Sequence, residues 1–176
     1  MIFSATKLSG VYIVDMARHA DQRGFFGRNW CTTEFVQHGL SGSLRQCNIS
    51  YNVKRGTLRG LHYQHPPHAE DKLVHCLTGA IYDVVVDLRP ESDTYSRWLA
   101  VELTADNGRM IYIPQGLAHG FITLADDTRV GYFITSDFTP SAQAGLRYDD
   151  PAFAIDWPIP VSVISERDRH WPNHVS

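Results

Sequence analysis

Two stretches of the sequence place basic side chains and imidazoles within strand-like, apolar surroundings. The first, Gly56-Thr57-Leu58-Arg59-Gly60-Leu61-His62-Tyr63-Gln64, carries Arg59 and His62 and is followed by Lys72. A Pro-x-Gly-x-x-His-Gly pattern further along the chain adds His119. Arginine and lysine hold anions, and histidine exchanges protons near neutral pH. The pattern predicts a pocket that binds an anionic ligand and carries out acid–base chemistry.

Arg59 and His62 can serve one pocket only if their strand is irregular. In a regular strand the two side chains point to opposite faces. Gly60 lies between them and is the natural position for a bulge that re-aims its neighbours. On these residues alone, a histidine base beside an anion-binding arginine is as consistent with the pattern as a purely structural pair.

Lys72 and Asp83 each have a structural interpretation beside the functional one. Lys72 begins a predicted strand, where a lysine usually reaches solvent, but a fixed cation could also stabilise an oxyanion. Asp83 shares a strand face with Asp87, opposite apolar residues, which predicts that both are solvated.

Tyr132 and Asp168 are equally open to two interpretations. Tyr132 lies in an apolar strand as a core or rim aromatic, yet a phenol can also donate a proton, with an ordinary pKa near ~10. Asp168 follows Ser165 by three residues, as the acid of a helix capping box would. Spacing alone connects neither residue to His62.

The pattern around His119 is similar to the second half of the metal-binding cupin signature. The first half should supply two histidines one residue apart, and here Gln64 stands where the second ligand belongs. A competent metal site needs at least three well-placed ligands. We therefore predict no metal and keep a metal-dependent cupin as an alternative.

Composition sets limits on the protein's class. The chain has 176 residues, which fits one domain over 1–176 with its own core, and its net charge of -3 argues against binding a nucleic acid polymer. Three cysteines without CxxC spacing fit a reducing cytosol. We expect a cytoplasmic protein, since the sequence shows no signal peptide and no membrane-spanning run.

Short strand-like runs separated by turn residues dominate the chain and predict an all-β sandwich or jelly-roll barrel. The runs are 11–14, 46–53, 57–64, 72–78, 80–88, 98–103, 109–113, 118–124 and 129–135. Two short helices are expected, at 32–38 with a capping threonine, and at 165–168. The proline-rich tail 151–172 should pack on the barrel as an irregular strap.

Taken together, the chain resembles the dTDP-4-dehydrorhamnose 3,5-epimerase family of cupin-fold nucleotide-sugar epimerases. The matching pieces run in family order over nearly the whole chain: Asp21-x-Arg23-Gly24-x-Phe26, Gln46-x-Asn48-x-Ser50, Gly56–Gln64, Lys72-Leu73-Val74, Asp83–Arg89, Ile113–Phe121, Tyr132, Asp149-Asp150-Pro151, Ile155-x-Trp157-Pro158 and Ser165-Glu166-x-Asp168. The resemblance implies a double-stranded β-helix (cupin) fold.

The resemblance also implies the chemistry. The substrate would be a nucleotide-linked 4-keto-6-deoxy sugar, epimerised at C3 and C5 through an enolate without cofactor or metal. His62, oriented by Asp168, would abstract a proton, Lys72 would stabilise the enolate oxygen, and Tyr132 would return a proton to the opposite face. The product of dTDP-4-dehydro-6-deoxy-D-glucose would be dTDP-4-dehydro-L-rhamnose.

The resemblance further implies the ligand contacts. Arg59 and Arg23 would hold the diphosphate, with Arg23 and Phe26 supplied by the neighbouring subunit of a homodimer. The remaining pocket residues would be Gln46, Asn48, His119 and Phe138. Departures from the family pattern leave the nucleotide, the sugar and the number of inverted centres open; they are Arg28, Cys47, Phe138 and Gln143.

Three alternatives remain at this stage. The protein could be a 3-only or 5-only epimerase acting on a different nucleotide sugar. It could also be a metal-dependent cupin enzyme, or a sugar-binding cupin without catalysis. Retention of the base and acid residues argues against binding alone.

Overall fold

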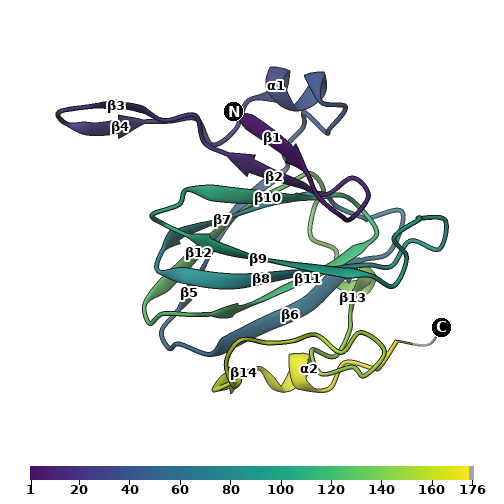
Figure 1. The fold of residues 1–176 in the computed structure, drawn as a ribbon. Coiled ribbons are helices and arrows are strands. Elements are labelled where there is room, and N and C mark those ends of the chain that lie inside the picture. The colour runs from purple at the N-terminus through teal and green to yellow at the C-terminus, as the bar shows by residue number, and fades with distance from the viewer. Residues whose placement is uncertain (175–176) are drawn as a thin grey trace.

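The computed structural model describes residues 1–174, and two β-sheets face each other in it (Figure 1). The first sheet has the order β1 (Ile2–Ala5), β2 (Tyr12–Asp15), β10 (Arg109–Ile113), β7 (Lys72–Thr78), β12 (Thr128–Ile134) and β5 (Gln46–Asn52). The second has the order β13 (Gln143–Gly145), β6 (Thr57–Gln64), β11 (Leu117–Thr123), β8 (Ala80–Asp87) and β9 (Trp98–Thr104), and β14 (Val163–Ile164) pairs in parallel with β6. The expected all-β jelly-roll barrel is confirmed.

The strands predicted from alternation are all present, with ends that differ by one residue at most. Their inward side chains form one apolar cluster between the sheets, which includes Val74, Val85, Ile111, Phe121 and Val130. β-branched and aromatic residues suit this half-buried, pleated surface. The filled interior supports the strands that carry the polar residues of the pocket.

Each sheet also buries part of its outer face. Helix α1 (Thr32–Gln37) packs Phe35 on the first sheet, beside Leu73 and Met110. The residue at its N-cap is Cys31, without a side-chain capping bond, so the expectation of a threonine cap is wrong. Packing of Phe35 rather than a cap therefore positions this helix.

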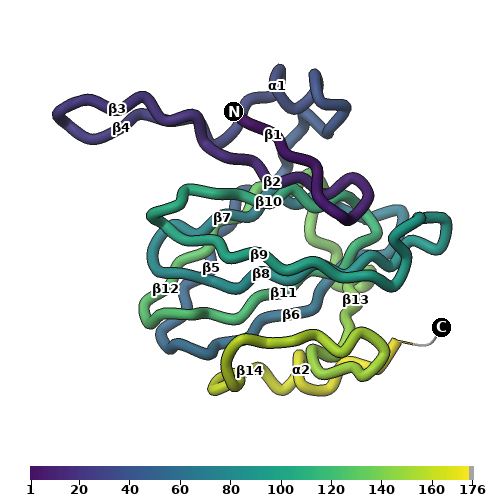
Figure 2. The backbone as a smooth tube through the Cα atoms, in the orientation of Figure 1, coloured from purple at the N-terminus to yellow at the C-terminus, as the bar shows by residue number. Residues whose placement is uncertain are grey.

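The C-terminal segment covers the outer face of the second sheet. It contains a 3-10 turn (Pro140–Ala142), β13, β14 and helix α2 (Glu166–Arg169), and it packs Leu146 and Phe153 against the sheet. The predicted irregular strap is confirmed, and Figure 2 shows it running alongside β6. This course brings residues of α2 next to the middle of β6.

A two-stranded arm projects from the barrel and was not predicted as strands. It consists of β3 (His19–Asp21) and β4 (Gly24–Phe26), and every residue of both strands is exposed. The arm extends away from both sheets (Figures 1 and 2).

Across residues 1–174, no helix is both long and apolar enough to cross a membrane.

Candidate active site

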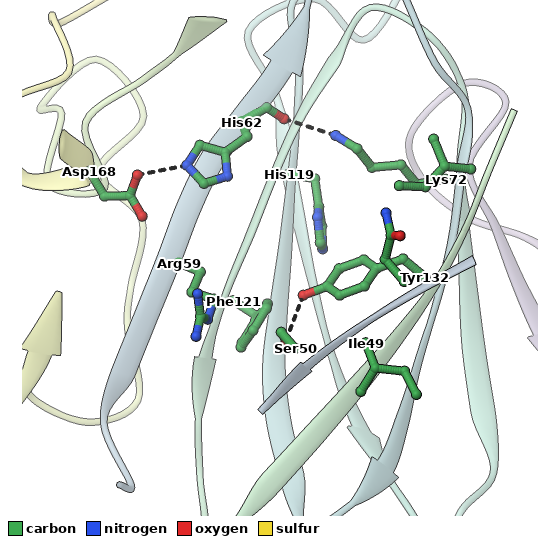
Figure 3. A pocket seen from close by; sticks show the side chains of 11 residues that line it. Ile49, Ser50, Arg59, His62, Lys72, His119, Phe121, Tyr132 and Asp168 are labelled. Atoms are coloured by element: carbon green, nitrogen blue, oxygen red, sulfur yellow. Dashed lines mark hydrogen bonds and ion pairs between the residues drawn. The ribbon is translucent and has the colours of Figure 1, made fainter. Parts of the chain in front are cut away.

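A cavity of about 320 Å³ opens between the sheets, and strands of both sheets contribute to it (Figure 3). It brings together most of the site residues predicted from the sequence: Asn48, Arg59, His62, Lys72, His119, Tyr132 and Asp168. Ile49, Ser50, Phe121 and Ile134 complete the lining. The cavity therefore joins residues from β5, β6, β7, β11, β12 and α2.

His62 and Asp168 form an imidazole–carboxylate pair at the cavity wall. His62 Nε2 lies 2.7 Å from Asp168 Oδ1, and the side chains are 32% and 7% exposed. Ser165 is the N-cap of α2 and accepts the Asp168 N–H, so the predicted cap is present, but the Asp168 carboxylate faces His62 instead of capping the helix. Although burial acts to raise the pKa of Asp168, its hydrogen bonds outweigh this effect and lower that pKa. The carboxylate is thus ionised and can orient the imidazole.

The break in alternation expected at Gly60 is present. His62 faces His119 in the β6–β11 ladder, but Arg59 faces Phe121, so the register shifts between these pairs. Gly60 has φ +117, and a Cβ there would lie 2.6 Å from the Cα of Gly120. Only glycine fits this close approach of two backbones. The bulge allows both Arg59 and His62 to line one cavity.

A second imidazole–carboxylate pair lies deeper in the barrel. His119 Nε2 is 2.8 Å from Asp83 Oδ2, and the side chains are 6% and 0% exposed. Burial raises the pKa of Asp83. The prediction that Asp83 and Asp87 are solvated is wrong, because both side chains are fully buried, Asp83 against His119 and Asp87 against Arg89.

Lys72 does not reach solvent, as a lysine at the start of a strand usually does, because its side chain is only 11% exposed. Lys72 Nζ lies 2.9 Å from Glu70 Oε1 and donates to the His62 carbonyl at 3.2 Å. Gln64 Nε2 donates to the other Glu70 oxygen at 2.6 Å. Glu70 was not among the predicted site residues, and its only signal was proximity in sequence to the lysine. The cation is held at the cavity rather than in solvent.

Gln64 occupies the place of the second metal ligand in the cupin signature, and it has a different role here. Its amide nitrogen donates to Glu70 and its Oε1 accepts the Thr139 N–H at 2.6 Å. Among residues 1–174, no three His, Cys, Asp or Glu side chains are grouped as metal ligands.

Tyr132 projects from β12 into the cavity (Figure 3). Its hydroxyl lies 3.1 Å from Ser50 Oγ, and its backbone partner in β5 is Asn48. Burial raises the pKa of Tyr132 well above its ordinary value, so the phenol is fully protonated at neutral pH. Ser50 belongs to the Gln46-x-Asn48-x-Ser50 motif, but its contact with the phenol was not predicted.

Arg59 is oriented towards the cavity entrance by two contacts. Arg59 Nε donates to Asn52 Oδ1 at 2.7 Å, and Nη2 donates to the Tyr51 carbonyl at 3.3 Å. The residue is exposed, which leaves guanidinium donors for a ligand.

Four predicted binding residues lie outside the cavity lining. Gln46 and Phe138 contact each other at its rim, where Gln46 Oε1 accepts the Phe138 N–H at 3.1 Å. Arg23 and Phe26 lie on the β3–β4 arm, with the Arg23 side chain 86% and Phe26 75% exposed. Within one chain, Arg23 and Phe26 are therefore not part of the cavity lining.

The departures from the family pattern have separate surroundings. Arg28 Nη1 pairs with Glu34 Oε1 at 2.6 Å, beside the base of the arm. Cys47 is exposed on β5. Gln143, opposite Gln64 in the β13–β6 ladder, has a buried Oε1 without a hydrogen-bond partner in the described part of the chain.

Comparison with known proteins gives one family. The sequence profile of the dTDP-4-dehydrorhamnose 3,5-epimerase family matches residues 5–175. The dTDP-4-dehydrorhamnose 3,5-epimerase of Methanothermobacter thermautotrophicus is 41% identical over 172 residues, covering 96% of this chain and 92% of that protein.

Solved structures agree with this result. The dTDP-4-dehydrorhamnose 3,5-epimerase of Bacillus anthracis, with TDP and PPi bound, has a TM-score of 0.95 at 36% identity and covers 98% of this chain and 99% of its own. The dTDP-6-deoxy-D-glucose-3,5-epimerase of Legionella pneumophila, in complex with dTDP-4-keto-L-rhamnose, has a TM-score of 0.90 at 31% identity, with 99% of both chains covered.

A 3'-monoepimerase from Streptomyces bikiniensis, in complex with dTDP-quinovose, has a TM-score of 0.89 at 31% identity, covering 96% of this chain and 85% of that chain. Fold similarity at this level is therefore shared by epimerases that invert different numbers of centres. The matched profile and the nearly full-length relatives show that this chain belongs to the dTDP-4-dehydrorhamnose 3,5-epimerase family of isomerases.

Proposed function

We propose that this protein is a dTDP-4-dehydrorhamnose 3,5-epimerase that converts dTDP-4-dehydro-6-deoxy-D-glucose into dTDP-4-dehydro-L-rhamnose. One observation carries the proposal: an imidazole–carboxylate pair, a lysine ammonium and a protonated phenol line the same cavity. Bacillus and Legionella relatives with TDP or dTDP-4-keto-L-rhamnose bound support a nucleotide sugar as the ligand.

The first step is removal of a proton next to the ketone. The C4 carbonyl acidifies the C–H bonds at C3 and C5. His62 Nδ1, the ring nitrogen that does not face Asp168, accepts the proton while Asp168 stabilises the imidazolium through Nε2. The electrons of the broken C–H bond move to the C4 oxygen, which becomes an enolate. Lys72 supplies positive charge where this oxyanion develops.

The second step returns a proton to the same carbon from the opposite face. Tyr132 comes from β12, in the sheet facing the β6 strand that carries His62, so acid and base lie on different sides of the cavity (Figure 3). Its raised pKa keeps the phenol protonated until the enolate is present. One C–H bond breaks and one forms, so the reaction needs no oxidant.

The diphosphate is assigned to Arg59, whose guanidinium matches phosphate oxygens in pairs. Asn48 and His119 contact the sugar and Gln46 positions Phe138, whose ring stacks on the base. We further propose that the one-domain chain forms a homodimer in the cytoplasm, in which the arm of one subunit delivers Arg23 and Phe26 to its neighbour's cavity.

Solvent-deuterium exchange tests the proposed function. The protein is incubated in D₂O with dTDP-4-keto-6-deoxyglucose, and label at C3 and C5 is read by NMR. Label at both carbons supports the 3,5-epimerase. Absence of label at both carbons contradicts the proposed substrate.

A second candidate is a 3-only or 5-only epimerase, favoured by the monoepimerase of the same fold and by Phe138 and Gln143, which depart from the family pattern. It predicts label at a single carbon in the same experiment. The two candidates are therefore separated by one spectrum.

A further inference from the structure

The C-terminal segment places an indole against the outer side of the His62–Asp168 pair. Trp171 Nε1 donates to Asp168 Oδ1 at 3.3 Å, and this is the oxygen that lies 2.7 Å from His62 Nε2. The indole and imidazole rings meet edge-on, with centroids 6.2 Å apart and an interplanar angle of 72°. One carboxylate oxygen is thus shared between the imidazole and the indole.

The barrel provides space for this indole at Gly145. Gly145 is the direct partner of His62 in the β13–β6 ladder. A Cβ on Gly145 would lie 2.4 Å from Cε2 of Trp171, and the backbone of Gly145 is not in the left-handed region. The glycine is therefore required by the indole and not by the conformation of the chain. The guanidinium carbon of Arg167 lies over the indole ring, 5.1 Å from its centroid.

Asp168 has a donor for each oxygen and a second donor for one of them. The Gly60 N–H donates to Oδ2 at 3.1 Å. Oδ1 accepts the indole N–H of Trp171 and also lies against His62 Nε2. The carboxylate is 7% exposed, so little water competes with these donors. Loss of one donor removes a large share of what fixes this carboxylate.

We propose that Trp171 is a positioning residue for the reaction: its indole N–H holds Asp168, and through Asp168 it fixes the orientation and proton affinity of His62. This inference rests on the proposed function for its kinetic consequence, but not for its effect on the pair itself. Trp171 does not line the cavity, so it acts without contact with the substrate.

The expected effect has a defined sign. With one donor fewer, the Asp168 carboxylate stabilises the protonated imidazole more strongly, so the pair loses its proton at higher pH. In Trp171→Phe, which keeps an aromatic ring, the acidic limb of kcat/KM should move up by roughly 0.5 pH unit, with a loss of about 3-fold below the midpoint. The other charged or titratable groups near the pair are unchanged in this variant: Arg59, Lys72, His119, Tyr132 and Arg167.

Trp157 offers a matched control on the same C-terminal segment. Its Nε1 donates to the Tyr148 carbonyl at 2.9 Å, so Trp157→Phe also deletes one indole hydrogen bond, but without contact with the pair. Gly145→Ala provides a second route, since the added methyl group displaces the indole while both Trp171 and Asp168 stay. We expect Gly145→Ala to shift the limb in the same direction as Trp171→Phe and Trp157→Phe to leave it in place.

Two readouts test the proposal in the full-length protein: the pH profile of kcat/KM, and NMR titration of the imidazole Cε1–H signal of the pair without ligand. Upward shifts in Trp171→Phe and Gly145→Ala, with none in Trp157→Phe, support it. An unchanged midpoint in Trp171→Phe, or a uniform loss of kcat/KM at every pH, overturns it. If the wild-type protein fails to exchange deuterium, the proposed function falls, and the NMR titration still decides the role of Trp171.

Discussion

His62–Asp168 and His119–Asp83 are two imidazole–carboxylate pairs of almost equal length, 2.7 Å and 2.8 Å, on neighbouring positions of one ladder. The first histidine is 32% exposed to the cavity, whereas the second is 6% exposed. Asp168 has donors on both oxygens, but Asp83 Oδ1 has none among residues 1–174. The same chemical pair is therefore placed in two different environments.

The environments set opposite protonation behaviour. Hydrogen bonds outweigh burial at Asp168 and lower its pKa, whereas burial dominates at Asp83 and raises its pKa. A pair with an ionised carboxylate and an accessible imidazole suits proton abstraction. A buried pair that holds its histidine rigidly suits orientation of the cavity wall. Substitutions in the two pairs should therefore have different effects.

The largest effect is expected for the accessible imidazole. His62→Asn removes the base, so exchange at C3 and C5 should fall by about 10²–10⁴-fold, the range that a general base supplies. Nucleotide affinity, measured by calorimetry with dTDP, should change little because Arg59 is intact. Wild-type exchange rates in this variant would transfer the base role to another group.

Asp168→Asn should follow with about a 10²-fold loss of kcat, because the neutral amide no longer stabilises the imidazolium. KM should move much less than kcat. A circular-dichroism melting curve checks that helix α2 stays docked. Equal losses in kcat and in dTDP affinity would indicate a binding role for this residue instead.

Asp83→Asn tests the buried pair, and here stability should respond more than chemistry. The amide leaves one buried hydrogen-bonding group mismatched, which costs about 1–3 kcal/mol of unfolding free energy. Denaturant titration measures this cost, and kcat should drop less than in Asp168→Asn. A loss of kcat larger than that of Asp168→Asn would reverse the assignment of the two pairs.

The smallest effect is the pH dependence of stability, which should have opposite signs for Asp168 and Asp83. Asp168 has a lowered pKa in the fold, so its stabilisation is present above the unfolded value of ~3.9 and is lost as the pH falls through the folded value. Asp83 has a raised pKa, so its contribution is largest below that unfolded value and declines as the pH rises.

Unfolding free energies from about pH 3 to about pH 6 measure this difference. The gap between wild type and Asp168→Asn should widen as the pH rises over this range, whereas the gap for Asp83→Asn should shrink. Parallel curves for both variants would show that the two carboxyls share one environment.

The sequence predicted the strands well because β-branched residues at alternate positions carry local information. It failed at Asp83, since alternation identifies a polar face but not whether a further layer covers it. It failed at Lys72 for a related reason, because Glu70 becomes its partner only after the strand is placed at the cavity. The β3–β4 arm carries no apolar alternation, since both of its faces are exposed.

Gly60 shows what local reasoning can achieve at a site. Two functional side chains on opposite faces required an irregularity, and the glycine between them located it. Asp168 shows the limit, because the distance between His62 and Asp168 depends on the course of the C-terminal segment around the barrel. The family resemblance supplied that pairing, and Trp171, outside the motifs, was missed.

Because Asp168 lies on α2, the site is complete only in molecules whose C-terminal segment is docked on the barrel. The other carboxylates near the cavity belong to the barrel or its loops, but this one arrives only when the segment has docked beside β6. Local opening that costs ~2 kcal/mol would leave roughly 3% of molecules with an intact barrel and no partner for His62. Maximal turnover is therefore limited by the docked fraction, and mutations far from the substrate can lower activity by releasing this segment alone.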